Sequence, residues 1–170
     1  MLNFPRKRGK IQNLMKKIRR LKKKSYIKFI ENSVGSKSWR NFYAVVGGEK
    51  ADVLKSGNLS CAFFASSVLL IFGLSGKISF TVKGAISDLE KNGWEEIGRL
   101  KPGAVLIWEK NKMFNNEHIG FCLNKKTAIS NYYKKRMPAK HHITYGTKNG
   151  RPVRRIIKIF WHKELDQFMI

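Results

Sequence analysis

Two side chains in this sequence, Cys61 and His118, have the types and local settings that suit nucleophilic chemistry. A thiol is a weak nucleophile at neutral pH, because its ordinary pKa is about 8.5. The first turn of a helix and a neighbouring imidazole both increase its reactivity. Cys61 follows Ser60, a residue type that often begins helices, and starts an apolar run that ends at Gly73. The pattern favours Cys61 as nucleophile, with a buried core thiol as the alternative.

The imidazole that suits this thiol begins a strand-like run over residues 118–123. Alternation places His118, Gly120 and Cys122 on one face of the strand. Gly120 leaves room for another element to approach closely. Cys122 lies roughly 13 Å along the strand from His118 and follows no helix start, so we interpret it as a packing residue. A helix-borne Cys61 and a strand-borne His118 suit a papain-type pair.

A third side chain is needed to orient the imidazole, and the hairpin after His118 decides which one it is. If residues 124–125 form a two-residue turn, Asn131 falls opposite His118. If the loop is one residue longer, the register shifts and Ser130 joins the face of His118 instead. His142 is a further alternative. We expect Asn131, because an Asn at the start of the loop tolerates the short turn and an amide oxygen accepts the imidazole N–H well.

The elements that must position these residues form a simple order along the chain. A helix from Cys61 to about Phe72 is apolar nearly all round and is therefore expected to be central and buried. Helix signals also mark residues 82–91, and strand signals mark residues 42–46, 51–54, 104–109, 118–123, 127–131 and 153–161. Helices first and an antiparallel run of strands afterwards predict an α+β domain.

The N-terminal residues 1–30 differ from the rest of the chain. The first 28 residues carry twelve Lys or Arg and no acidic residue. Apolar residues recur there at helical spacing: Ile11, Leu14, Ile18 and Leu21. We expect a basic amphipathic helical arm over 1–30 and one domain over 31–170. The arm could pack on the domain, lie on an anionic membrane or bind nucleic acid.

The charge of the whole chain is strongly positive, with 35 Lys and Arg against 11 Asp and Glu and a formal net charge of +24. Such an excess indicates anionic partners such as nucleic acid, acidic lipid headgroups or cell-wall polymers. A general bias of the source proteome toward Lys is the alternative explanation outside the N-terminus. The charge carries no information about the fold.

Several other classes are not supported by the sequence. Two cysteines do not make a disulfide framework, and the four His residues show no paired metal-ligand spacing. No metal or organic cofactor is therefore expected. No apolar segment follows the basic start as in a signal peptide, and the run over 61–74 is too short to span a bilayer. We expect a monomer that is cytoplasmic or exported by a non-classical route.

Three motifs in this order resemble the NlpC/p-sixty family of papain-like cysteine peptidases. They are Cys61 at a helix start, the strand entry Leu-Lys-Pro-Gly at 100–103, and His-Ile-Gly-Phe at 118–121. The match extends over about residues 55–135, and the CHAP amidase group is similar. The family pattern has Asp where this chain has Ser60 and Ala104, and it has a third His where this chain has Ser130.

The resemblance implies a papain-like NlpC-type fold and hydrolysis of peptide or amide bonds, such as those of bacterial peptidoglycan stem peptides. Cys61 would form an acyl-thioester, with His118 as base and Asn131 as the orienting residue. A different class of function remains open: an inactive papain-like scaffold that binds nucleic acid or an anionic membrane through its basic residues and exposed aromatic residues.

Overall fold

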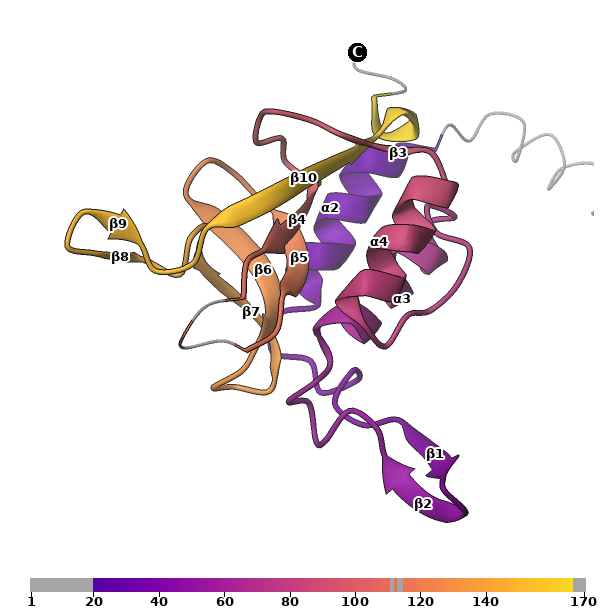
Figure 1. Cartoon of the computed structure of the whole chain (residues 1–170). Coiled ribbons are helices and arrows are strands. Elements are labelled where there is room, and N and C mark those ends of the chain that lie inside the picture. The colour runs from indigo at the N-terminus through magenta and orange to yellow at the C-terminus, as the bar shows by residue number, and fades with distance from the viewer. Residues whose placement is uncertain (1–19, 111, 113–114, 167–170) are drawn as a thin grey trace, which may run out of the picture.

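The computed structural model describes residues 20–110, 112 and 115–166, which form an α+β domain of helices and antiparallel sheets (Figure 1). Its α-helices are α2 (Lys22–Asn32), α3 (Cys61–Ile71) and α4 (Val82–Lys91), and a short 3-10 helix η1 (Lys163–Leu165) lies near the C-terminus. The α+β class expected from the sequence is therefore confirmed. The helix over 82–91 has the expected bounds, and Thr81 caps it by accepting a hydrogen bond from Gly84 N.

The main sheet has six strands in the order β3-β10-β4-β5-β6-β7, and every neighbouring pair is antiparallel. Its strands are β3 (Trp94–Glu96), β4 (Val105–Trp108), β5 (His118–Cys122), β6 (Thr127–Tyr132), β7 (Met137–His142) and β10 (Ile156–His162). Four of these six strands were expected from the sequence. The sequence analysis missed β3 and β7, since β3 is short and β7 contains Pro138 and three basic residues.

Two small hairpins lie away from the main sheet (Figure 1). One pairs β1 (Tyr43–Val46) with β2 (Glu49–Asp52), close to the strands expected over 42–46 and 51–54. The other pairs β8 (Thr147–Lys148) with β9 (Arg151–Pro152). The second hairpin matters for the site, because the chain returns from it through Arg154 into β10.

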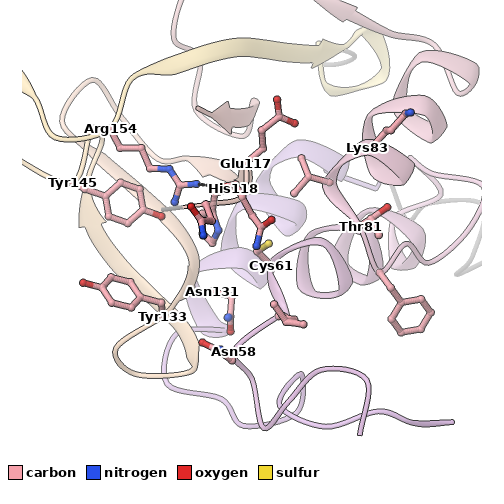
Figure 2. A pocket seen from close by; sticks show the side chains of 15 residues that line it. Asn58, Cys61, Thr81, Lys83, Glu117, His118, Asn131, Tyr133, Tyr145 and Arg154 are labelled. Carbon is pink, nitrogen blue, oxygen red and sulfur yellow. Dashed lines mark hydrogen bonds between the residues drawn. The ribbon is translucent and has the colours of Figure 1, made fainter. Parts of the chain in front are cut away.

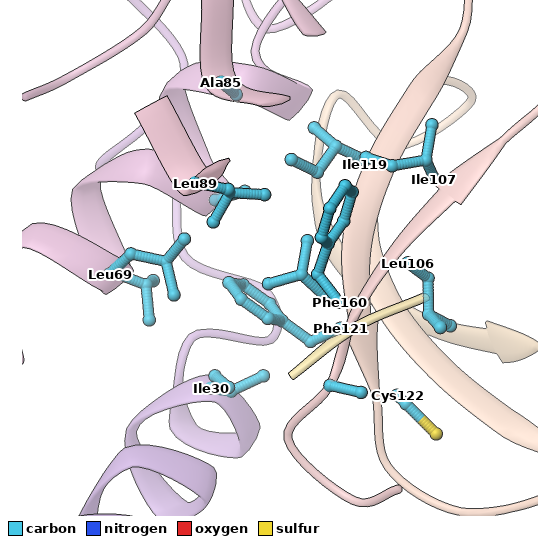
Figure 3. Close-up of a cluster of buried hydrophobic side chains, with 14 of the residues drawn as sticks. Ile30, Leu69, Ala85, Leu89, Leu106, Ile107, Ile119, Phe121, Cys122 and Phe160 are labelled. Atoms are coloured by element: carbon cyan, nitrogen blue, oxygen red, sulfur yellow. The ribbon is translucent and has the colours of Figure 1, made fainter. Parts of the chain in front are cut away.

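The hydrophobic core lies between the helices and the sheet (Figure 3). Helix α3 supplies Phe64, Val68 and Leu69 to this core, and its apolar composition on all sides explains its central position. Phe64 packs edge-on against Phe121 of β5, with ring centroids 5.6 Å apart. The helix that begins at Cys61 and the strand that begins at His118 are therefore packed directly against each other.

Helix α2 is part of this core rather than of a separate arm. Tyr26 and Ile30 are fully buried, and the Tyr26 hydroxyl donates a hydrogen bond of 3.0 Å to Gly103 O. The expected boundary between residues 1–30 and 31–170 therefore cuts through an element that packs with the domain. Residues 1–19, including Ile11, Leu14 and Ile18 of the expected stripe, lie outside the described residues.

Replacing Tyr26 with alanine should lower the free energy of unfolding by about 3–5 kcal/mol, as for other buried aromatic truncations. The ring packs edge-on against Phe72 and Phe121, so its loss leaves a cavity at the centre of the core. Urea denaturation monitored by tryptophan fluorescence measures the change. The exposed Lys24→Ala substitution on the same helix is the control and should stay within about 0.5 kcal/mol. A similar small loss for Tyr26→Ala would mean that α2 is only loosely attached.

Within the described residues, no helix has the length and apolar character needed to cross a membrane. The apolar run that begins at Cys61 forms the 11-residue helix α3 in the core, as its length predicted.

Candidate active site

Cys61 is the first residue of α3, as expected from the sequence. Ser60 occupies the N-cap position, but its side chain makes no capping hydrogen bond. The main-chain N–H groups of the first helical turn therefore remain directed at the region of the thiol. Cys61 is half-buried, whereas Cys122 is fully buried at the other end of β5.

The protonation state of Cys61 differs from the activated thiolate that its helix position suggested. Burial raises the pKa of the Cys61 thiol above its usual value. The main-chain N–H groups of Ile119 and Ala62 lower the pKa, as does the charge of Arg154, but these effects are smaller than that of burial. The resting sulfur is therefore a thiol, and a base must remove its proton during attack.

His118 begins β5, as expected, and its ring is enclosed by aromatic side chains. Its ring centroid lies 5.8 Å from that of Trp108 and 6.1 Å from that of Tyr145. Burial lowers the pKa of His118 well below its usual value, and the charges of Arg154 and His141 lower it further. The imidazole is therefore neutral at pH 7, which is the form that can accept a proton.

The Ser130 side chain, and not that of Asn131, contacts His118, because the hairpin loop has three residues and not the two that were expected. The Asn124 side-chain oxygen accepts hydrogen bonds from the main-chain N–H groups of Lys126 and Thr127, which stabilises a three-residue loop. The resulting register pairs Gly120 with Ser130. The Ser130 hydroxyl oxygen then lies 2.9 Å from His118 Nε2. Asn131 was the wrong choice between the two stated alternatives.

Asn131 instead connects the sheet to the loop before the nucleophile. Its side-chain amide donates a buried hydrogen bond of 2.7 Å to Gly57 O. Gly57 itself passes very close to the β6–β7 turn, because a Cβ atom added there would lie 2.4 Å from Arg136 O. These two contacts set the position of the loop that leads into Cys61. The other alternative, His142, directs its Nδ1 to the main-chain N–H groups of Thr144 and Gly146.

Ser130 also contacts two side chains that the sequence analysis missed, His141 and Tyr145. The Ser130 hydroxyl lies 2.8 Å from His141 Nε2 and 2.9 Å from the Tyr145 hydroxyl. Burial lowers the pKa of His141 to about 4, so this second imidazole is also neutral at pH 7. A single hydrogen-bonded cluster thus contains His118, Ser130, His141 and Tyr145.

The proton positions in this cluster follow from one fixed acceptor. His141 Nδ1 lies 2.8 Å from the carbonyl oxygen of His142, and a carbonyl can only accept, so Nδ1 carries the proton. Nε2 of neutral His141 must then accept the single proton of Ser130. The Ser130 oxygen accordingly accepts from Tyr145 and from His118 Nε2–H. His118 Nε2 is therefore a donor to Ser130, and a main-chain hydrogen bond with Asn131 also acts on the ring and raises its pKa.

Cys61 and His118 line the same open pocket, which has a volume of about 670 Å³ (Figure 2). Asn131, Tyr145 and Arg154 also line it. No local pattern in the sequence could have identified His141, Tyr145 or Arg154. They come from β7, the turn after it and the segment before β10. Folding of the main sheet brings Tyr145 and Arg154 to the pocket and His141 to Ser130.

Among residues 20–110, 112 and 115–166, no three His, Cys, Asp or Glu side chains come together in a way that could hold a metal ion. The site thus combines a thiol, a neutral imidazole that contacts Ser130, and a cationic guanidinium.

A scan against models of known protein families and a search of curated proteins found no match to this chain. Any assignment of function therefore depends on the geometry of the site and on the sequence motifs.

Proposed function

We propose that this protein is a thiol hydrolase that cleaves a peptide or amide bond through Cys61 and His118. The observation that carries the proposal is that both residues line one pocket, while the Ser130 hydroxyl holds the His118 ring through a contact of 2.9 Å to Nε2. A structural thiol and a structural histidine have no need of this arrangement. Perturbed titratable groups that meet in a cleft are a recognised indicator of a functional site.

In the proposed mechanism, the Cys61 sulfur attacks the carbonyl carbon of the substrate while His118 Nδ1 accepts the thiol proton. The resulting imidazolium keeps its Nε2–H bond to the Ser130 oxygen. The developing oxyanion can be stabilised by the main-chain N–H of Cys61 at the start of α3. His118 then returns the proton to the leaving amine, and an acyl-thioester forms on Cys61. Water attacks the thioester, again with His118 as the base, and releases the acid.

We propose a papain-like fold of the NlpC/p-sixty kind for this domain, and a cell-wall stem peptide is one candidate substrate. The support is the order of the sequence motifs, together with the packing of a Cys-bearing helix on an antiparallel sheet. Ser130 occupies the position of the third His of that family, and it contacts the base as that residue would. The alternative of an inactive binding scaffold has weaker support, because a thiol and an imidazole line one pocket and a hydroxyl group contacts the imidazole.

The test of this proposal is the reactivity of the two thiols. Iodoacetamide at pH 7 should alkylate Cys61 at least about 100-fold faster than Cys122 in the folded protein. Cys61 opens into the pocket beside a base. Cys122 is fully buried, its sulfur contacts Asn124 O, and burial raises its pKa to about 11. Peptide mapping by mass spectrometry at timed intervals measures both rates.

His118→Ala and Cys122→Ala provide the matched controls for the labelling experiment. The first should slow the alkylation of Cys61, and the second should leave it unchanged. Equal and slow modification of both thiols in the wild-type protein would exclude a hydrolase built on Cys61. Such a result would favour the binding-scaffold alternative.

A further inference from the structure

The hairpin of β1 and β2 projects away from the helices and the main sheet (Figure 1). The carboxylate of Asp52 holds its base by accepting four hydrogen bonds, from Asn41 Nδ2 and from the main-chain N–H groups of Phe42, Leu54 and Ser56. A two-stranded hairpin is only marginally stable alone, so these bonds help to keep its shape outside the core. The hairpin is therefore an ordered projection of the domain.

The two edges of this hairpin differ in their chemistry. The β1 strand has the uncharged sequence Tyr-Ala-Val-Val, whereas β2 has the sequence Glu-Lys-Ala-Asp. Tyr43 and Val45 of β1 are 73% and 68% exposed. Charged residues on an edge strand discourage pairing with another chain, and an exposed uncharged strand favours it. The β2 edge thus has this protection, and the β1 edge lacks it.

The register shows which main-chain groups of β1 point outward. Val53 N donates a hydrogen bond of 2.9 Å to Phe42 O, so the main-chain groups of this pair face each other across the hairpin. The direction alternates along antiparallel strands, so the N–H and C=O groups of Tyr43 and Val45 point to the outer edge. In the part of the chain that the structure describes, β2 is the only strand paired with β1. The outer edge therefore presents donors and acceptors that an added strand can pair with.

The start of β1 lies beside the candidate active site. Phe42, the residue before β1, packs against Phe63 and Phe80, with ring centroids 5.5 and 4.9 Å away. Phe63 lies two residues after Cys61 in α3. Phe80 lines the pocket that contains Cys61 and His118. An extended strand on the β1 edge would therefore have one end near the pocket.

Resting on the proposed hydrolase function, we infer that the β1 edge binds an extended segment of a polypeptide substrate by β-strand addition. Four residues of edge are too few for a stable interface with a second protein, because specific interfaces bury about 1,200–2,000 Å². A substrate that is also held in the pocket needs less from the edge, because its second segment then binds at a high effective concentration. The substrate class is thus a polypeptide with an extended, uncharged segment some residues away from the cleaved bond.

A reactive strand peptide tests this inference without knowledge of the substrate. The probe is a hexapeptide of alternating Thr and Val that carries an iodoacetyl group, through a glycine spacer, at one end or the other. The better of the two versions should alkylate Cys61 about tenfold or more faster than iodoacetamide, because strand pairing raises the local concentration of the reagent. The same peptide with every main-chain N–H methylated should lose this advantage, since it cannot donate to the β1 edge.

Val45→Pro and Lys50→Pro are the matched pair of variants. The two residues face each other in the hairpin, and the N–H of each points away from the other strand. Proline therefore removes an outward donor from β1 or from β2 without removing a bond between them. The ratio of the peptide rate to the iodoacetamide rate should fall about tenfold in Val45→Pro and should be unchanged in Lys50→Pro.

Amide hydrogen exchange of the wild-type protein is a second measurement, in case Val45→Pro does not fold. The hexapeptide without its iodoacetyl group should slow the exchange of the Tyr43 and Val45 N–H groups. No rate advantage for the peptide, or an equal advantage in a folded Val45→Pro, would overturn the inference. Protection of these amides in the protein alone that rises with its concentration would assign the edge to a second copy of the chain, and would also overturn it. Failure of the hydrolase proposal is distinguished by iodoacetamide alone, which would then label Cys61 no faster than Cys122.

Discussion

The His118→Ala variant should lose turnover of an amide substrate by a factor on the order of 10³ while its fold is retained. General base catalysis contributes about 10²–10⁴ to such reactions. The contribution of His118 should be large here, because burial raises the pKa of Cys61 and the sulfur is protonated before it attacks. The measurement is kcat/KM on a panel of fluorogenic peptide amides.

Added imidazole distinguishes a missing base from a damaged structure. The substitution leaves a ring-sized space between Trp108 and Tyr145, which small imidazole can enter. Partial recovery of turnover with imidazole concentration is expected, with no effect of imidazole on the wild type. Activity of His118→Ala within threefold of the wild-type value would remove His118 from the mechanism and would refute the proposed function.

The Ser130→Ala variant should reduce kcat by about 10–100-fold with a small effect on KM. Ser130 is a positioning residue, because it acts on the imidazole and does not line the pocket. Without the hydroxyl, His118 Nε2–H loses its acceptor and the ring is free to adopt the other tautomer. That tautomer places a proton on Nδ1, where the thiol proton must go.

The pH profile of Ser130→Ala separates this role from a purely structural defect. Hydrolysis requires neutral His118, so activity is present above its pKa and is lost as the pH falls through it. This pKa is well below 6.5 in the wild type, so full activity should persist through pH 6.5. The Ser130 oxygen accepts a stronger hydrogen bond from the charged imidazolium than from the neutral ring. Removing the Ser130 hydroxyl should therefore lower the pKa of His118 and shift the acid-side loss of activity to lower pH.

Asn131→Ala provides the contrast with Ser130→Ala. The Asn131 side chain contacts the main chain of Gly57 and holds the loop before α3. Its loss leaves Gly57 O without this buried donor and should lower the free energy of unfolding by about 1–3 kcal/mol. The acid limb should stay in place. A shifted limb in Asn131→Ala and an unchanged limb in Ser130→Ala would restore the first assignment of the orienting residue.

Elements could be predicted from the sequence where their apolar residues form a long run or a clear alternation. Helix α3 could be predicted because its apolar run exceeds a strand in length and ends at Gly73, and β5 because its alternation is clear. The candidate nucleophile and the candidate base are the first residues of these two elements. The choice between Asn131 and Ser130 depended on whether the hairpin loop has two or three residues. The Asn124 side chain decides the loop length through two local hydrogen bonds. Both loop lengths were compatible with the same residue types.

The residues around the base could not be predicted, because their roles arise only from tertiary structure. His141 lies in a strand of mostly polar and basic residues, and only its pairing beside β6 brings it to Ser130. Arg154 is one of 35 Lys and Arg residues, and its sequence neighbour Arg155 is exposed. Burial distinguishes the two, and no periodicity in the segment 153–156 encodes it.

The contact between Asn131 and Gly57 joins two parts of the chain that are 74 residues apart, and it has a consequence for heat inactivation. The Cys61 sulfur belongs to the helical layer, and the His118 imidazole belongs to the sheet. One buried hydrogen bond and one close main-chain approach hold the loop that leads into Cys61. These contacts involve a loop and a turn, so they can open while the core is still intact. On heating, the protein would then pass through a temperature range in which it is folded but inactive. Cooling from that range would restore its activity without refolding.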